Sequence, residues 1–374
     1  MARIISTVFG SLMACFLVTA ASNADQIEVV NLVTNDQSAN PAGITDASLK
    51  NAWGVSHGTS GPFWVSANGS GLSTLYSVDP TTNTTTKLGL EVTIQGNGSV
   101  TGQAFNAGAG TGAFNDDTFL FVSEDGTVSG WRSTLGTIAE ILQSPSPNAV
   151  YTGSAFLSSG GHSYLLSANF HSGNIDVLKE DVGAPDLGGK FLDPNLPAGF
   201  APYNVETIGN SIFVTYAKQG TGGGVETGAG LGFVTQFGLD GTFLARVGTG
   251  GMLNAPWGLA IAPSAFSGIG GDLLVGNFGD GTINIFDLDT NSFVGQLSDF
   301  HNNLIQIDGL RALILGNDAS AGSSSKVYFS AGPNGGANGV FGVLQSVPEP
   351  SSILMSGIGS LMLLACGIRA RRGR

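Results

Sequence analysis

A pattern that recurs about every 50 residues is the feature that most constrains how this 374-residue chain folds. An apolar run that ends in small or polar residues occurs six times, and a second strand-like run follows each copy after a turn or loop. The six copies are residues 63–68, 120–125, 164–169, 212–216, 273–277 and 327–331. A further strand precedes each copy; counted at residues 54, 102, 153, 204, 258 and 309, the steps are 48, 51, 51, 54 and 51 residues. Repeats of this length built from short strands are typical of β-propeller blades.

We therefore predict an all-β fold, a six-bladed β-propeller with four strands in each blade. The outermost strands are expected at 84–93, 137–142, 189–192, 242–247 and 292–297. The sixth unit has no such strand of its own, whereas an apolar run at 27–33 precedes the first unit. We expect 27–33 to pair with 339–345 and close the ring, because closure removes most exposed sheet edges.

Composition agrees with a turn-rich β protein. Glycine accounts for 58 residues, apolar residues make up 42% of the chain, and charged residues make up 11% against a usual ~25%. This composition excludes a coiled coil, a collagen and a disordered chain. Five arginines and one glutamate lie in the predicted end segments, so residues 25–346 keep 9 basic and 26 acidic residues, a net charge near −17. That charge argues against nucleic acid as a partner.

The two ends read as targeting segments. Residues 1–24 have the pattern of a secretory signal peptide, with Arg3, an apolar run at 4–20 and a cleavage site between Ala24 and Asp25. The other end combines Val347, Pro348, Glu349 and Pro350 with an uncharged apolar run at 351–368 and a basic cluster at 369–374. The run is just long enough to span a membrane. The only cysteines, Cys15 and Cys366, lie in these segments, so the body at 25–346 contains no disulfide.

The C-terminal segment, 347–374, resembles the bacterial PEP-CTERM sorting signal, and the body resembles the NHL-like propellers. The resemblance implies an uncharacterised exported family. It implies recognition by exosortase, a membrane protease-transpeptidase, and membrane attachment through the tail before processing. It also implies a Gram-negative host that makes exopolysaccharide, with the protein in the cell envelope, on the cell surface or in the extracellular matrix.

The central channel is where the sequence places a ligand site, because propellers gather the starts of their innermost strands around the axis. The candidates near one mouth are Asn51, Trp53, Gln103, Tyr203, Asn204, Glu206, Trp257 and Asp308. Oxygen-bearing side chains in such a ring hold a cation in lactonase-type propellers, where the metal polarises a carbonyl. Aromatic and amide side chains also suit a sugar. Core packing and backbone capping explain the same residues without any ligand.

Other motifs point less clearly to chemistry. The four histidines fall in four separate regions, so no close pair of histidine metal ligands is present in the sequence. Residues 287–291 begin like a calcium loop but lack its glycine and its final glutamate, so we interpret them as a hairpin turn. Clustered carboxylates in such turns would bind calcium weakly, and calcium is the one cofactor that the sequence suggests.

Three functions follow from these observations. The first is a non-catalytic binding protein for a glycan or another envelope component, favoured by the tail and by the low charge. The second is a metal-dependent hydrolase of lactonase or esterase type, with its site in the channel. The third is a scaffold that binds a partner protein.

Overall fold

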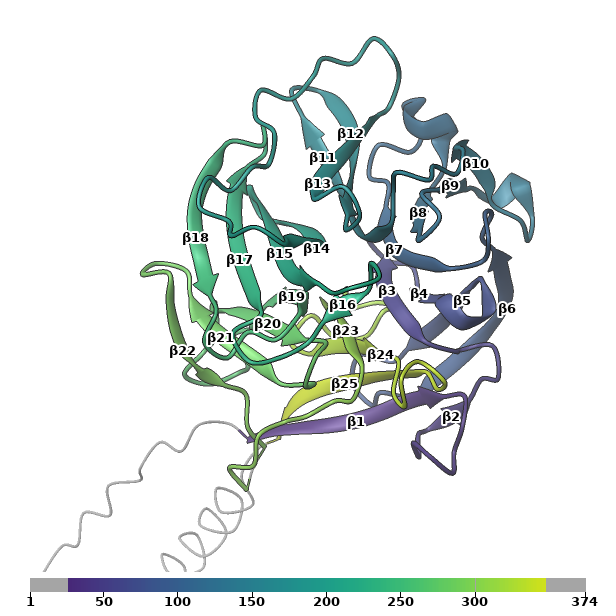
Figure 1. Ribbon diagram of the computed structural model, residues 1–374. Coiled ribbons are helices and arrows are strands. Elements are labelled where there is room, and N and C mark those ends of the chain that lie inside the picture. Colours follow the sequence, from purple (N-terminus) through teal and green to yellow (C-terminus); the bar gives the residue numbers. More distant parts are fainter. Residues whose placement is uncertain (1–25, 300, 348–374) are drawn as a thin grey trace, which may run out of the picture.

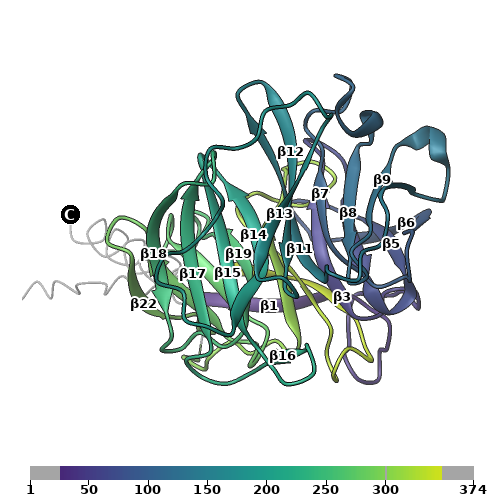
Figure 2. The same ribbon diagram turned by 45° about the horizontal axis from the view of Figure 1, so that its top comes forward.

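The computed structural model describes residues 26–299 and 301–347, and these fold into a ring of six sheets around a central axis (Figures 1 and 2). The predicted signal peptide at 1–24 and the predicted tail segments 348–350, 351–368 and 369–374 lie outside the described residues. Within the described ranges, no helix is long and apolar enough to cross a membrane.

The strands follow the predicted repeat, each blade running from an inner to an outer strand. Blade 1 contains β3 (Ala52–His57), β4 (Phe63–Ala67), β5 (Leu72–Val78) and β6 (Thr85–Thr93). Blade 2 contains β7 (Val100–Phe105), β8 (Phe119–Ser123), β9 (Val128–Trp131) and β10 (Glu140–Gln143). Blade 3 contains β11 (Tyr151–Ser159), β12 (His162–Asn169) and β13 (Asn174–Lys179).

The second half of the ring has the same order. Blade 4 contains β14 (Phe200–Ile208), β15 (Ser211–Gln219), β17 (Gly232–Gly238) and β18 (Phe243–Thr249), with the short β16 (Val225–Glu226) beside β15. Blade 5 contains β19 (Pro256–Ile261), β20 (Leu273–Asn277), β21 (Ile283–Asp287) and β22 (Ser292–Gln296). Blade 6 contains β23 (Leu310–Leu315), β24 (Val327–Ala331), β25 (Val340–Val347), β1 (Gln26–Thr34) and β2 (Ile44–Thr45). Three short 3₁₀ turns complete the described chain: η1 (Asn68–Ser70), η2 (Ala113–Asp116) and η3 (Ser133–Leu135).

Burial explains why the second strand of each blade gave the strongest sequence signal. All five residues of β4, β8, β20 and β24 are buried, because these strands are covered by neighbouring blades on both faces. Strands covered on both faces read as continuous apolar runs. The outer strand β22, by contrast, begins with three exposed residues.

The predicted ring closure is confirmed. β1 pairs antiparallel with β25 from Gln26 opposite Val347 to Thr34 opposite Val340, with one bulge between Asn31 and Val33. The first described strand thus supplies the fourth strand of the last blade.

The predicted outer strand of blade 3, at 189–192, is wrong. Phe191 has a left-handed backbone with φ of 53°, which a strand does not contain. The amide of Gly189 donates to the carbonyl of Asp240 at 2.7 Å, and the Phe191 ring lies 5.7 Å from the ring of Phe237. This segment is therefore anchored to blade 4, and blade 3 ends at β13.

Candidate functional site

Small residues draw the inner strands together around the axis. A Cβ atom on Gly102 would lie 2.5 Å from the amide nitrogen of Ser154, and one on Gly54 would lie 2.7 Å from the carbonyl oxygen of Thr101. A Cβ atom on Gly258 would lie 2.4 Å from the carbonyl oxygen of Arg311. By analogy with Gly54, whose added Cβ approaches the carbonyl of the residue before Gly102, the equivalent residue of blade 6 is Ala312 and not Gly309. The channel is consequently narrow at this level.

An aromatic cluster lies next to this constriction, since Trp53 and Trp257 directly precede Gly54 and Gly258. The rings of Trp53 and Trp257 meet edge to face with centroids 6.3 Å apart. The indole nitrogen of Trp257 donates to the carbonyl of Thr152 at 2.9 Å, and so links blade 5 to blade 3. These contacts agree with the core-packing interpretation of both tryptophans.

Arg311 lies inside this cluster and was not among the sequence candidates. Its guanidinium carbon lies 3.8 Å from the ring centre of Trp53 and 3.5 Å from that of Phe278. The side chain is 5% exposed, and its Nε and Nη1 atoms have no hydrogen-bond acceptor among the described residues. Burial lowers the pKa of Arg311, with Tyr203 and Glu124 acting in the opposite direction, and burial raises the pKa of Tyr203. A positive charge here disfavours a divalent cation at the same level.

The structure does not bring the predicted amides and acids into one ring. Gln103 donates to the carbonyl oxygen of Gly54, and Asn204 donates to that of Trp257 at 2.9 Å. Asn51 donates to the side chain of Asn68 at 2.9 Å. Asp308 is exposed in the turn before β23 and accepts a hydrogen bond from the amide of Asn334. These four residues join blades or shape turns.

Glu206 is the one predicted acid that lines the channel. It borders a cavity of about 20 Å³, room for about one water, which Gly54 and Gly102 also line. Its carboxyl group has no hydrogen-bond or ion-pair partner among the described residues, and burial raises its pKa to about 8.

No cluster of three or more His, Cys, Asp or Glu side chains that could hold a metal occurs within 26–299 and 301–347. The aspartate-rich motif at 287–291 forms the turn between β21 and β22, where the Asp287 carboxylate accepts the amides of Asp289 and Thr290.

An open site lies at the rim, along the edge of blade 3. The other five blades each have a fourth strand, whereas nothing in the described chain pairs with the outer side of β13. The amide of Glu180 donates inward to Ser163, so in the antiparallel alternation Ile175, Val177 and Lys179 direct their N–H and C=O groups outward. These backbone groups could pair with a further strand, and no strand of the described chain does so.

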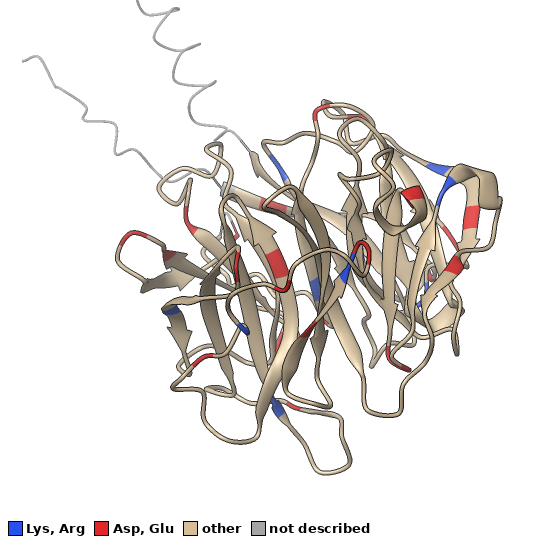
Figure 3. Ribbon diagram, turned by 90° about the horizontal axis from the view of Figure 1, so that it is seen from above, with Lys and Arg blue, Asp and Glu red and all other residues tan. Residues whose placement is uncertain are grey.

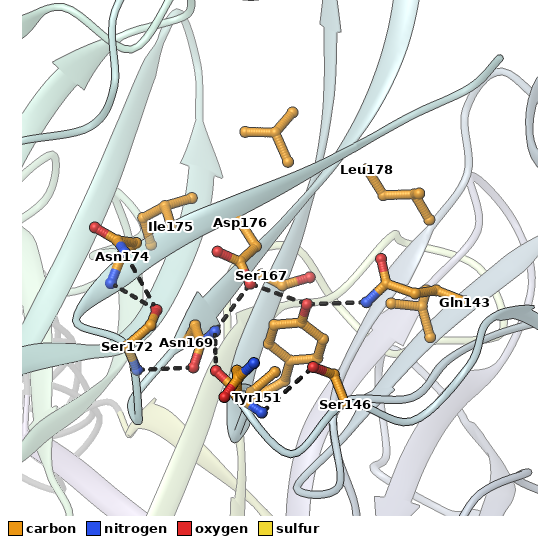
Figure 4. A pocket seen from close by; sticks show the side chains of 14 residues that line it. Gln143, Ser146, Tyr151, Ser167, Asn169, Ser172, Asn174, Ile175, Asp176 and Leu178 are labelled. Carbon is orange, nitrogen blue, oxygen red and sulfur yellow. Dashed lines mark hydrogen bonds between the residues drawn. The ribbon is translucent and has the colours of Figure 1, made fainter. Parts of the chain in front are cut away.

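One cavity, the blade-2 pocket, lies between this edge and blade 2 and has a volume of about 600 Å³ (Figure 4). The Tyr151 hydroxyl donates to Asp176 Oδ2 at 3.0 Å and accepts from Gln143 at 3.0 Å, while Asn169 donates to the same Asp176 oxygen at 2.9 Å. Burial raises the pKa of Tyr151 to about 12, so its hydroxyl remains a donor at neutral pH. The rest of the polar lining is neutral, and contains Ser146, Asn148, Ser167, Ser172 and Asn174.

A second cavity, the blade-4 pocket, lies on the other face of β13 and has a volume of about 480 Å³. Its lining includes Val177, Leu187, Phe191 and Leu192. Lys179 and Asp186 form an ion pair at 3.1 Å within the same lining. Sequence reasoning missed both pockets because it assigned a strand to 189–192. The prolines at 185, 194 and 197 were the available signal that this stretch is a loop.

Comparison with known proteins identifies viral relatives. The chain is 32% identical to uncharacterised protein R648 of Acanthamoeba polyphaga mimivirus over 293 residues, which cover 73% of this chain and 70% of that protein. It is 31% identical to uncharacterised protein L690 of the same virus over 260 residues, 65% of this chain and 67% of that protein. No family model matches.

Among solved structures, streptogramin B lyase aligns with a TM-score of 0.44 and 13% identity, covering 87% of this chain and 98% of the lyase. Hydrazine synthase of Kuenenia stuttgartiensis aligns with a TM-score of 0.43 and 12% identity, covering 78% and 95%. Likenesses this weak carry no argument about function.

These findings overturn the expected membership of a bacterial PEP-CTERM family. The matching proteins are viral and uncharacterised, and no family model supports the resemblance. The exosortase and the exopolysaccharide were implied by that resemblance alone, and they lose their support with it. Membrane attachment through 351–368 rests on the length of that apolar run and stays a prediction. The segments on which the resemblance rested, Pro348, Glu349, Pro350 and 351–374, lie outside the described residues.

Proposed function

We propose that this chain, which belongs to the family of uncharacterised mimivirus proteins that includes R648, is a binding scaffold that accepts an extended polypeptide segment at the open edge of blade 3. The observation that carries the proposal is the missing fourth strand of that blade. Three residues of β13, namely Ile175, Val177 and Lys179, offer free backbone groups between two cavities.

Strand addition is a known way in which sheet edges bind peptides, since backbone hydrogen bonds supply affinity and flanking pockets supply specificity. Natural proteins usually protect such edges with charged side chains, above all lysine, or with proline, bulges or a covering loop. β13 contains no proline, its one lysine, Lys179, is already paired with Asp186, and its register with β12 is unbroken from Asn174 to Lys179. The edge is therefore in a state that favours pairing.

The channel gives less support to a metal-dependent hydrolase. Arg311 places a positive charge among the aromatic rings, and Gln103 and Asn204 already bond to backbone carbonyls. A cation would have to displace these bonds and tolerate the arginine.

A neutral carbohydrate in the blade-2 pocket is the second candidate, and the lining of that pocket favours it. Amide and hydroxyl side chains with a single carboxylate, Asp176, suit the hydroxyl groups of a sugar. Titration calorimetry with neutral oligosaccharides tests this candidate. A sugar that binds equally well to the wild type and to Val177→Pro uses the pocket rather than the strand edge.

Export is a separate proposal, which rests on the signal-peptide pattern of residues 1–24. N-terminal sequencing of protein produced in a secretion-competent host tests it. A start at Asp25 supports export, and a retained N-terminus contradicts it.

The substitution Val177→Pro tests strand addition directly. Proline removes the outward N–H of residue 177, while the inward bonds of Asp176 and Leu178 to β12 are kept. We expect Val177→Pro to abolish binding of extended eight-residue peptides on an array, and Val177→Thr, which keeps the N–H, to retain it.

Hydrogen exchange provides a second readout on the wild type. The amides of Ile175, Val177 and Lys179 should exchange rapidly in the free protein and become protected with bound peptide. Peptide binding without protection of these three amides would contradict the proposal.

A further inference from the structure

We infer that the segment accepted by blade 3 alternates cationic and apolar side chains, with the cationic ones facing the blade-2 pocket and the apolar ones facing the blade-4 pocket. The inference rests on the proposed function and adds the chemistry of the partner. It follows from the different character of the two faces of β13.

The geometry of an added strand fixes which side chains meet which pocket. The outer strands β6, β10, β18 and β22 all run antiparallel to their neighbours, as does β1. An antiparallel strand on β13 would place one residue directly opposite Val177, and its successive side chains would point to opposite faces. Every second side chain therefore enters the same pocket.

The face toward blade 2 selects positive charge. Asp176 lies on this face, because it accepts a hydrogen bond from Tyr151. Its Oδ2 atom already accepts two bonds, from Tyr151 and Asn169, whereas its Oδ1 atom accepts none among the described residues. The pocket lining contains no lysine or arginine. One carboxylate oxygen is thus left to pair with an incoming ammonium or guanidinium group.

The face toward blade 4 selects apolar side chains. Ile175 packs into the core between blades 3 and 4 with Phe191, which assigns this face to the odd-numbered residues of β13. Val177 is 38% exposed and Leu192 is 56% exposed, although both line the cavity. Lys179 is paired with Asp186, so its charge is already balanced. An apolar side chain opposite Val177 would cover this exposed surface.

The net negative charge of the whole molecule also favours a cationic segment. Acidic residues are spread over the described body and basic residues are few (Figure 3). Residues 25–346 carry a net charge near −17. Such a field speeds the approach of a cationic segment, and added salt weakens it.

The experiment uses three synthetic eight-residue peptides and the full chain. One alternates Lys and Val, the second Glu and Val, and the third Ser and Val. Binding is followed by fluorescence anisotropy at low and at physiological salt. A Lys–Val peptide that is N-methylated on every residue has the same charge but no backbone N–H to donate to β13, so it reports non-specific attraction.

We expect the Lys–Val peptide to bind up to about fivefold more tightly than the Ser–Val peptide, and the Glu–Val peptide to bind least, because an exposed ion pair contributes up to about 1 kcal/mol. Asp176→Asn should remove most of this preference. Asp289→Asn removes the same charge from the exposed turn of blade 5 and should leave the preference unchanged. The N-methylated peptide should not bind.

Each contrary result has a distinct meaning. Equal binding of all three peptides, lost in Val177→Pro, would overturn the alternating charge pattern and leave strand addition standing. Failure of all three peptides to bind would overturn strand addition and the charge pattern together. If the wild type forms dimers and Val177→Pro is a monomer, a second copy of the chain occupies the edge, and the inference is overturned.

Discussion

Replacing Arg311 with methionine should make the protein more stable, although arginine contacts two aromatic rings. The substitution loses the attraction of the guanidinium for Trp53 and Phe278 and its polar contact with Tyr203, which we put together at about 3 kcal/mol. It also removes two buried N–H groups, Nε and Nη1, that have no acceptor among the described residues. Each unsatisfied donor costs about 1–3 kcal/mol, or about 4 kcal/mol for the pair.

Methionine fills a similar volume, and its sulfur packs favourably against aromatic rings. The balance predicts a gain of about 1–2 kcal/mol, which corresponds to a rise in Tm of about 2–6 °C. Equilibrium denaturation and thermal melting of the two proteins measure the change. Arg311→Ala should instead lose about 3 kcal/mol, because it leaves a cavity between the rings.

Arg246 provides the matched contrast. It pairs with the buried carboxylate of Asp193 at 2.5 Å, so Arg246→Met should cost about 3–5 kcal/mol by leaving that charge unpaired. If Arg311→Met were as destabilising as Arg246→Met, the Nε and Nη1 groups of Arg311 would have acceptors in solution, and the predicted gain in stability would be refuted.

Two further predictions concern the channel. Gly102→Ala should destabilise the protein by about 3 kcal/mol, because its Cβ would lie 2.5 Å from the amide nitrogen of Ser154; an unchanged denaturation midpoint would contradict the close approach of these strands. Glu206→Gln should flatten the pH dependence of stability. Burial raises the folded-state pKa of Glu206 to about 8, so its contribution is full below the unfolded pKa and is lost as the pH rises toward and through 8. With solvent screening allowed for, we expect the wild type to lose about 2 kcal/mol between pH 5 and 8 relative to Glu206→Gln, and equal pH profiles would argue against a buried carboxyl group.

The repeat predicted most of the fold because its signal came from buried strands. The runs at 273–277 and 327–331 coincide with β20 and β24, where burial on both faces demands apolar residues throughout. The closing strand was also predictable, since 27–33 had the right pattern and no other place in the repeat. Both inferences rest on hydrophobic burial, which a single sequence displays directly.

The site was less predictable because it depends on departures from the repeat. Gly309 was taken as the start of the sixth inner strand, but it lies in the preceding turn with φ of 67°. Because of that shift, the sequence candidates left out Arg311 and included Asp308, which lies in the turn before β23 and not in the channel. At blade 3, the run at 189–192 looked like a strand, yet the ring of Phe191 packs against Phe237 of blade 4. Tertiary packing determines both positions, and the repeat pattern in the sequence does not indicate that packing.

The pairing of β1 with β25 has a mechanical consequence. Gln26 lies directly opposite Val347, so a load applied between these two residues pulls the strands apart from one end and breaks their hydrogen bonds one pair at a time. Shearing would require all the pairs to fail together. The ring should therefore open at this seam under a small force, while the other five blades remain folded. Joined at both ends to structures that move apart, the molecule would yield at blade 6 first and leave β13 intact on the far side of the ring.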